Sequence, residues 1–341
     1  MLLVIFGAGA SHDSADQYVL GELPPPLAKD LVADRFSDIA AAFPSSQPVI
    51  ARLRSRMSDG TASLEKELAE LAERSKDQPE RREQLMIFRY YLQRVIARSV
   101  GEWMTKHNNF TRYLDLVNEL YDRQQAGQTG PIRFATFNYD LMLEEALHTM
   151  FPDWNVATLG SYLSGEDFRV FKLHGSINWV RVLPVQINHA EATTGVAARI
   201  ARDGVDVGSG MLALGDYPEM VGAPTGHYEL QVPALAVPMA NKTEFECPGE
   251  HVDSLSGDID AVTHVLIIGW RGAERHAVEL LARLRPQYKL GLVSGTEDDA
   301  SELMRNLGSA VEGRADLRIT ELGGFVAFMA HVDTHLRALF A

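Results

Sequence analysis

Two polar motifs carry side chains suited to proton transfer. Asn138-Tyr139-Asp140 follows one short apolar run, and His174 follows the next. An imidazole titrates near pH 6.5 when unperturbed, so His174 can take a proton from a hydroxyl or from water at neutral pH. The amide of Asn138 can hold that hydroxyl without adding a full charge. The motifs therefore predict a catalytic set of Asn138, His174 and Asp140, with His174 as the general base.

Each of these side chains also has a structural interpretation. His174 can cap the edge of a sheet by bonding to backbone groups. Asn138 can be the N-cap of the helix expected after it, although Asp140 suits that cap better. For Asp140 the cap and a ligand contact weigh equally, so both roles stay open.

A glycine-rich turn, Gly7-Ala8-Gly9-Ala10-Ser11, follows the first apolar run. Two glycines at this spacing let backbone amides approach a pyrophosphate at a helix N-terminus. The third glycine of the usual fingerprint would fall at His12, and no convincing acidic residue ends a second strand about 20 residues on. The turn predicts a bound dinucleotide and argues against an ordinary dehydrogenase. A tight turn without a ligand has the same pattern, and Ser11 suits a helix N-cap as well as a phosphate contact.

Two further turns carry small residues after apolar runs. Gly269-Trp270 follows one run and Ser294-Gly295 follows the next, with acidic residues close behind the second. In an open parallel sheet, ligands bind outside the carboxyl ends of the strands. We therefore expect Gly269, Trp270, Ser294 and Gly295 at the same edge as the glycine turn, with Ser294 and Gly295 near an adenosine ribose. Trp179, after the histidine motif, fits a core residue better than a lid.

The elements that must hold these residues are short apolar runs without alternation. Such runs predict strands of a parallel sheet that helices cover on both faces. Helical patterns follow several of them, including 141–150 and 274–284. We predict a Rossmann-like, doubly wound α/β fold with a mainly parallel six-stranded sheet. The six predicted strands are residues 2–6, 132–137, 170–173, 264–268, 289–293 and 317–319.

The remaining sequence divides into two regions. Residues from about 27 to 126 are charged and amphipathic, with Leu64, Leu68 and Leu71 on one helical face, and they predict a helical insertion between strands one and two. Its expected role is a cap on the sheet or an oligomer surface. Residues from about 182 to 261 carry many glycines and prolines and predict irregular structure with short strands. We expect residues 1–341 to form a single domain.

Composition limits the kinds of ligand. At 341 residues and 46% hydrophobic content, the chain can bury a substantial core. A net charge of -14 makes direct nucleic-acid binding unfavourable, because neutralising phosphates requires clustered Lys and Arg. Cys247 is the single cysteine, which excludes a disulfide framework and a cysteine-rich zinc module. His331 and His335 lack the glutamate of a zinc-protease motif, so we expect no metal.

Targeting segments are not expected either. The first apolar run lacks a basic flank and is interrupted by glycine too early for a signal peptide. No stretch reaches the roughly 18 apolar residues of a membrane span. We expect a cytoplasmic protein without membrane contact.

Three motifs together resemble those of the SIR2-like (sirtuin-type) family in kind, spacing and order. They are Gly7-Ala8-Gly9-Ala10-Ser11, Thr136-Phe137-Asn138-Tyr139-Asp140 and Lys172-Leu173-His174-Gly175-Ser176. The resemblance implies that the first holds NAD phosphate, the second contacts the nicotinamide end and the third supplies the catalytic histidine. It also implies that Gly269 and Trp270 flank the adenosine ribose. Pro238-Met239-Ala240-Asn241-Lys242 is similar to a segment common before that strand in bacterial members.

The sequence departs from the protein-deacylase sirtuins in two places. One cysteine cannot build their four-cysteine zinc ribbon. Their Pro-Asp-Phe-Arg segment is also missing after the glycine turn. What remains resembles the SIR2-like NAD hydrolases of bacterial anti-phage defence. That resemblance implies NAD as substrate, a protein partner or activator, and a homo-oligomer.

Three functions stay open at this point. The first is hydrolysis of NAD to nicotinamide and ADP-ribose, with Asn138 and His174 at the bond that breaks. The second is transfer, as protein deacylation or ADP-ribosylation. The third is a non-catalytic module that senses NAD or ADP-ribose. The missing zinc ribbon weighs against deacylation.

Overall fold

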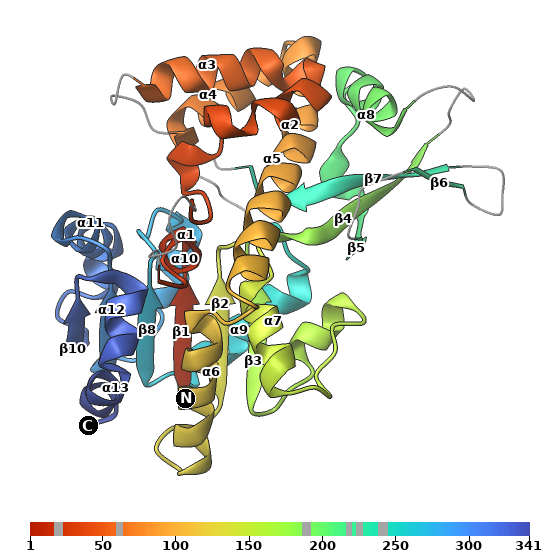
Figure 1. The fold of residues 1–341 in the computed structure, drawn as a ribbon. Coiled ribbons are helices and arrows are strands. Elements are labelled where there is room, and N and C mark those ends of the chain that lie inside the picture. The colour runs from red at the N-terminus through yellow and green to blue at the C-terminus, as the bar shows by residue number, and fades with distance from the viewer. Residues whose placement is uncertain (17–22, 59–63, 186–191, 216–219, 223–227, 238–244) are drawn as a thin grey trace. The chain divides into compact units, whose positions relative to one another are not determined.

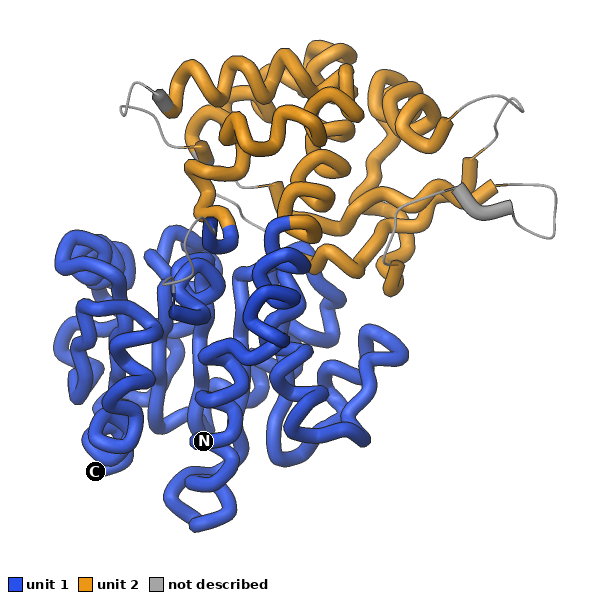
Figure 2. The backbone as a smooth tube through the Cα atoms, viewed as in Figure 1, with its two compact units in different colours: residues 1–25, 99–174, 241–341 blue, residues 26–98, 175–240 orange. Residues whose placement is uncertain are grey.

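The chain folds into two compact units, coloured separately in Figure 2. Unit 1 contains residues 1–25, 99–174 and 241–341, and unit 2 contains residues 26–98 and 175–240. The structure is a computed structural model, and it describes residues 1–16, 23–58, 64–185, 192–215, 220–222, 228–237 and 245–341.

Unit 1 is built on one six-stranded sheet, seen in Figure 1. The order across the sheet is β10-β9-β8-β1-β2-β3, and every neighbouring pair is parallel. All six strands coincide with apolar runs of the sequence, which confirms the predicted Rossmann-like α/β class. Their bounds are β1 Leu2–Phe6, β2 Ile132–Thr136, β3 Phe168–Lys172, β8 His264–Ile268, β9 Tyr288–Val293 and β10 Ala315–Glu321.

Helices cover both faces of this sheet, which is why its central strands are apolar throughout. Leu3 and Ile5 of β1 belong to a core with residues of helices α9, α10 and α11. Phe6 points to the other face, where its ring lies 4.9 Å from Tyr113 of α6 and 6.4 Å from Phe325 of α12. The helices of unit 1 are α1 Ala8–His12, α6 Arg112–Gln125, α7 Met142–Met150, α9 Gly249–Asp258, α10 Arg275–Leu281, α11 Glu297–Leu307, α12 Gly324–Ala330 and α13 Val332–Phe340.

The chain reverses its direction of travel across the sheet at β1. From β1 it proceeds to β2 and β3 on one side, and then returns to β8, β9 and β10 on the other. This is the doubly wound order, in which the connections after the two central strands lead to opposite sides of the sheet and ligands bind near that switch point. Here those connections follow β1 and β8.

Unit 2 combines helices with an antiparallel sheet of order β5-β4-β7-β6. Met86, Ile87 and Tyr90 of helix α5 share a core with Val196 of α8 and Leu230 of β7. Helix α5 continues along the chain into unit 1. The elements are α2 Ser37–Ala42, α3 Gln47–Ser58, α4 Leu64–Ser75, α5 Pro79–Lys106, α8 Thr193–Arg202, β4 Gly175–Val185, β5 Met211–Leu214, β6 Met220–Gly222 and β7 Tyr228–Leu235.

The helical periodicity of the first half of the chain is confirmed in detail. Leu64, Leu68 and Leu71 are all buried on one face of α4. The stretch from residue 182 to 261 contains helices α8 and α9 besides strands, and the glycine and proline content gave no sign of these helices. Of the helices in the described ranges, none combines the length and apolar character of a membrane span.

A buried ion pair ties the end of β3 to helix α7. The Lys172 ammonium lies 2.8 Å from a Glu144 carboxylate oxygen, and the side chains are 0% and 9% exposed. Lys172 also donates a hydrogen bond to the backbone carbonyl of Asp140, and the Tyr162 hydroxyl donates to Glu144. The pair thereby fixes the segment after β2 against the end of β3.

We expect Lys172→Met to destabilise unit 1 in a pH-dependent way. Burial raises the pKa of the Glu144 carboxyl, and the neighbouring Lys172 ammonium counteracts that effect. When folding raises the pKa of a carboxyl, the stability that this carboxyl contributes is lost as pH rises. Removing the Lys172 ammonium therefore lowers the free energy of unfolding most at a pH where Glu144 would be ionised. Urea unfolding should show a loss of about 3–5 kcal/mol near pH 7 and a smaller loss near pH 4.

The control is Lys76→Met, since Lys76 pairs with Glu73 on the surface of unit 2 and both side chains are largely exposed. That substitution should leave the free energy of unfolding nearly unchanged. An equal loss for Lys172→Met at both pH values would contradict the assigned role of the pair.

Candidate functional site

The predicted site residues follow five neighbouring parallel strands of unit 1. The glycine turn follows β1, Asn138 lies just after β2, and His174 just after β3. Gly269 follows β8, and Ser294 follows β9. Because the strands are parallel and adjacent, these residues all lie at the carboxyl edge of the sheet. The edge is therefore the place where a ligand site is expected.

The turns after β1 and β8 are in direct backbone contact. A Cβ on Gly7 would lie 2.5 Å from the Gly269 carbonyl oxygen, and a Cβ on Gly9 would lie 2.9 Å from the Gly269 Cα. Gly269 itself has φ +63°, and a Cβ there would lie 2.2 Å from the Ala10 nitrogen. No side chain larger than hydrogen fits these contacts. The three glycines are required by this packing, whether or not a ligand is bound.

The amides of the glycine turn are largely used within the protein. Gly7 N–H donates to the Ile268 carbonyl and Gly9 N–H to the Gly269 carbonyl, each at 3.0 Å. Ala10 N–H donates to the Gly7 carbonyl at 2.9 Å. These three amides are not directed at a phosphate, and α1 is only five residues long. Ala8 is the exposed residue of the turn.

Asn138 occupies the centre of a buried polar cluster. Its Nδ2 lies 3.0 Å from the Gly7 carbonyl oxygen, 2.9 Å from Ser11 Oγ and 3.1 Å from the Tyr113 hydroxyl. A carbonyl oxygen only accepts hydrogen bonds, so the contact with Gly7 fixes which side of the amide carries the nitrogen. Asn138 is 6% exposed, and its Oδ1 has no hydrogen-bond partner among the described residues. The site thus presents one oriented acceptor that lacks a donor.

The hydrogen-bond directions around Ser11 follow from the Asp140 carboxylate. Ser11 Oγ donates to Asp140 Oδ2 at 2.7 Å, which uses its only proton. The Tyr113 hydroxyl, 3.0 Å from Ser11 Oγ, must then be the donor in their contact. Burial raises the pKa of Tyr113 well above its ordinary value, so this hydroxyl keeps its proton. Ser11 and Tyr113 hold Asn138 in place.

Both carboxylate oxygens of Asp140 are engaged within the protein. Oδ2 accepts from Ser11, and Oδ1 accepts from the Met142 amide at 3.0 Å, at the start of α7. Asp140 is 7% exposed. The carboxylate is thus bonded to the backbone beside Leu141, the N-cap residue of α7, and to Ser11, and its two predicted roles stay open.

The imidazole of His174 lies among rings from the segment that carries Asn138. The Phe137 ring contacts it edge-on at 4.9 Å, and the Tyr139 ring lies 6.2 Å away in a stacked orientation. The Glu274 carboxylate approaches His174 Nε2 to 3.8 Å. His174 is 5% exposed. The two residues that flank Asn138 in the chain thus contact the predicted general base.

Of the remaining predicted residues, Trp270 and Trp179 lie in the core, while Ser294 and Gly295 follow β9. The Trp270 ring is 4% exposed and stacks on Phe137 at 4.9 Å, so it is a core residue whose backbone contacts the glycine turn. The Ser294 amide donates to the Glu321 carbonyl, and the Ser294 carbonyl accepts from the Gly324 amide. These bonds join the Ser294 backbone to the end of β10 and the start of α12, while Gly295 is exposed. Trp179 is fully buried in unit 2, as expected for a core residue.

Three residues of this region had no signal in the sequence. Tyr113 belongs to an apolar helical stripe, and the pattern does not distinguish its hydroxyl from a core ring. Glu274 precedes α10 as an ordinary charged residue would, and Lys172 ends a strand. Only the fold brings them to Asn138, His174 and Asp140. The segment 238–242, which contributed to the family resemblance, lies outside the described residues.

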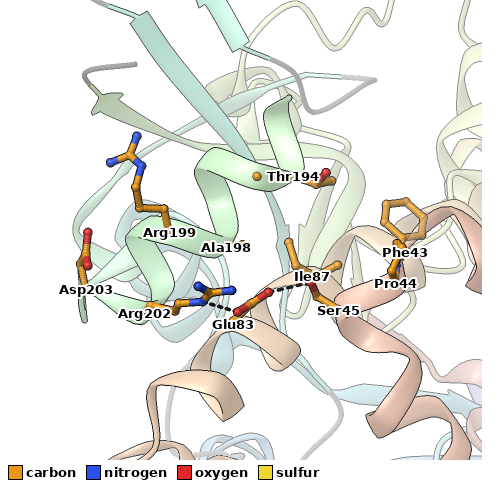
Figure 3. A pocket seen from close by; sticks show the side chains of 11 residues that line it. Phe43, Pro44, Ser45, Glu83, Ile87, Thr194, Ala198, Arg199, Arg202 and Asp203 are labelled. Atoms are coloured by element: carbon orange, nitrogen blue, oxygen red, sulfur yellow. Dashed lines mark hydrogen bonds and ion pairs between the residues drawn. The ribbon is translucent and has the colours of Figure 1, made fainter. Parts of the chain in front are cut away.

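Two surface cavities lie away from these residues. One, of about 470 Å³, is lined within unit 2 by α5, α8 and the segment around Pro44, as Figure 3 shows. There the Glu83 carboxylate accepts from Ser45 and pairs with Arg202. The other lies in unit 1 between α6 and α13. Across the described ranges, no group of three or more His, Cys, Asp or Glu side chains is arranged to hold a metal ion.

Comparison with known proteins gives structural likeness of a weak degree. No family model and no curated protein matches the sequence. A solved structure described as a mutant Sir2 homologue in complex with 2'-O-acetyl ADP ribose aligns with 100% of this chain and 93% of that chain. The sequence identity is 12% and the TM-score is 0.40. A likeness of this degree carries no functional argument. The candidate site is therefore defined by the contacts of its own residues.

Gly269→Ala should strongly destabilise unit 1. The added methyl would meet the Ala10 nitrogen and the Gly9 backbone in a conformation that side chains rarely adopt. We expect a loss of more than about 2 kcal/mol in urea unfolding. Gly257→Ala in α9 is the matched control, because nothing lies within 4 Å of its added Cβ. It should raise helix stability by about 0.5–1 kcal/mol, and equal losses for both variants would rule out the interlock of the two turns.

Tyr113→Phe should loosen Asn138 without emptying the core. The variant keeps the ring against Phe6 but removes the hydroxyl that contacts Ser11 and Asn138. We expect about 1–2 kcal/mol of lost stability and faster solvent exchange of the Asn138 side-chain amide protons in NMR spectra. The control is Tyr121→Phe on the same helix, where the half-buried ring packs on Phe151. Unchanged amide exchange in Tyr113→Phe would refute the positioning role.

Proposed function

We propose that this protein is an NAD glycohydrolase that cleaves the bond between nicotinamide and ribose, releasing nicotinamide and ADP-ribose. The observation that carries the proposal is the buried, oriented Oδ1 of Asn138, for which the described residues supply no hydrogen-bond donor. A ribose hydroxyl or a water molecule supplies the O–H that this acceptor requires. The three motifs that resemble SIR2-like proteins support NAD as the substrate.

The chemistry requires positioning more than acid catalysis. Nicotinamide leaves from a positively charged nitrogen, so no group has to protonate it. Positive charge instead develops on the ribose, as in glycoside hydrolysis. A neutral amide oxygen such as Asn138 Oδ1 can stabilise that charge and hold the attacking hydroxyl. Its fixed orientation means that little reorganisation is needed when the bond breaks.

His174 is the general base of the proposal. It takes a proton from the attacking water as the water oxygen bonds to the ribose carbon and the bond from that carbon to nicotinamide breaks. The surrounding rings of Phe137 and Tyr139 limit the access of further water. Such exclusion favours one attack geometry over others.

The other predicted residues take supporting roles in this proposal. Ser11 and Asp140 hold Asn138 through their mutual hydrogen bond, since their side-chain oxygens are already engaged. Gly7, Gly9 and Gly269 set the shape of the edge where the dinucleotide binds. Ala8, Ala10, Trp270, Ser294 and Gly295 complete the proposed NAD-binding edge.

The biological setting is part of the proposal. The resemblance to bacterial anti-phage NAD hydrolases indicates a defence role, with a partner protein or self-association controlling the activity. In that case, bacteria that express the protein should lose NAD after phage infection, and bacteria that express Asn138→Ala should not.

The decisive assay measures nicotinamide released from NAD by the purified protein. We expect Asn138→Ala to lower kcat by about 10²–10³-fold and His174→Ala by about 10²–10⁴-fold, because each removes a group that acts at the reacting bond. Controls are Asn118→Ala and His148→Ala, two exposed residues of α6 and α7 that should retain full activity.

The products separate the alternatives. ADP-ribose as the second product supports hydrolysis, whereas modified protein or a deacylated peptide supports transfer. Undiminished release from both site variants would contradict the proposal. So would intact NAD that stays bound without turnover, with or without candidate partners, and that result would favour a sensing module.

A further inference from the structure

Four side chains of unit 1, His174 among them, form a closed ring of contacts. The Glu274 carboxylate lies 3.8 Å from the imidazole through Oε1 and accepts a 2.6 Å hydrogen bond from Trp270 Nε1 through Oε2. Trp270 stacks on Phe137 with the ring planes 12° apart. The Phe137 ring in turn contacts the His174 imidazole edge-on. Each member of the ring is thus held by two others.

The position of Glu274 is set by these contacts and not by its own helix. It is the N-cap residue of α10, yet its side chain makes no capping hydrogen bond there. The carboxylate instead reaches back to Trp270, on the turn after β8, and to His174, at the end of β3. Its side chain is 18% exposed, so the charge is only partly screened by water.

We propose that Glu274 is a positioning residue that orients the His174 imidazole and stabilises its protonated form. When the base takes a proton from the attacking water, the imidazole becomes a cation. A carboxylate about 4 Å away favours that cation. The catalytic part of this inference rests on the proposed NAD hydrolysis, whereas the coupling between the two side chains does not.

Glu274 is the charged partner among the groups that face the imidazole. Among the described residues, the titratable side chains whose contacts with it are defined are Tyr139, from the segment after β2, and Glu274, from the segment after β8. A phenol is neutral below a pH of about 10, so Tyr139 adds no charge near neutrality. Phe137, the third contact, does not titrate. The pH response of His174 is therefore expected to depend on Glu274.

The test is an NMR titration of the His174 ring in the full chain, with the signals assigned from their loss in His174→Gln. Glu274→Gln is nearly isosteric and keeps an oxygen that can accept from Trp270. We expect the titration midpoint of the ring to fall by about one pH unit or more in this variant. Glu279→Gln is the matched control, since Glu279 lies on the exposed face of α10 and pairs with Arg275. It should leave the midpoint unchanged.

A ring that titrates at the same pH in wild type and Glu274→Gln, or in neither, overturns the coupling. The same variants then enter the nicotinamide-release assay. We expect kcat to fall at least about tenfold in Glu274→Gln with KM nearly constant, and the acidic limb of the pH profile to move to lower pH. A shifted midpoint with an unchanged kcat overturns the catalytic part. A wild-type protein that releases no nicotinamide refutes the proposed function, while the titration still decides whether Glu274 and His174 are coupled.

Discussion

The contact between the turns after β1 and β8 is a backbone contact, with the Gly9 amide bonded to the Gly269 carbonyl at the point where the sheet reverses its strand order. The positions of the site residues at the carboxyl edge depend on this contact. The Gly7 carbonyl, held in this contact, is the acceptor that fixes the amide of Asn138. The same packing places Trp270 against Phe137, and Phe137 against His174. A side chain on any of the three glycines would displace both the residues around Asn138 and the residues around His174.

The polar cluster behind this edge has a definite hydrogen-bond direction. Because the Asp140 carboxylate can only accept, Ser11 must donate to it and Tyr113 must donate to Ser11. A buried network whose members are satisfied is rigid, and a single member left without a partner is costly. Asn138 Oδ1 is the exception in the cluster, since no described residue donates a hydrogen bond to it. An acceptor left open where its neighbours are all bonded is the feature expected of a ligand contact.

The sequence predicts most of the sheet but little of the support for the site. Continuous apolar runs identified all six strands of unit 1, because strands buried on both faces need no alternation. The motif residues Asn138 and His174 were found because they directly follow such strands. Tyr113 and Glu274 were not, since Tyr113 bonds to Ser11 across 102 residues of chain and Glu274 approaches His174 from a different turn. The antiparallel sheet of unit 2 and helix α8 were hidden by glycines and prolines. The single-domain organisation, the boundaries of the insertion and the site roles stay predictions.

The buried pair of Lys172 and Glu144 has a consequence for how this sequence can vary. Neither side chain can be exchanged alone for an apolar one without leaving an ion buried, so related sequences should change both positions together or neither. Lys172 also bonds to the carbonyl of Asp140, which restricts the replacement further. Covariation between these two positions, and with the residue at 140, would identify homologous sites more reliably than the glycines do. Any tight pair of turns would keep the glycines.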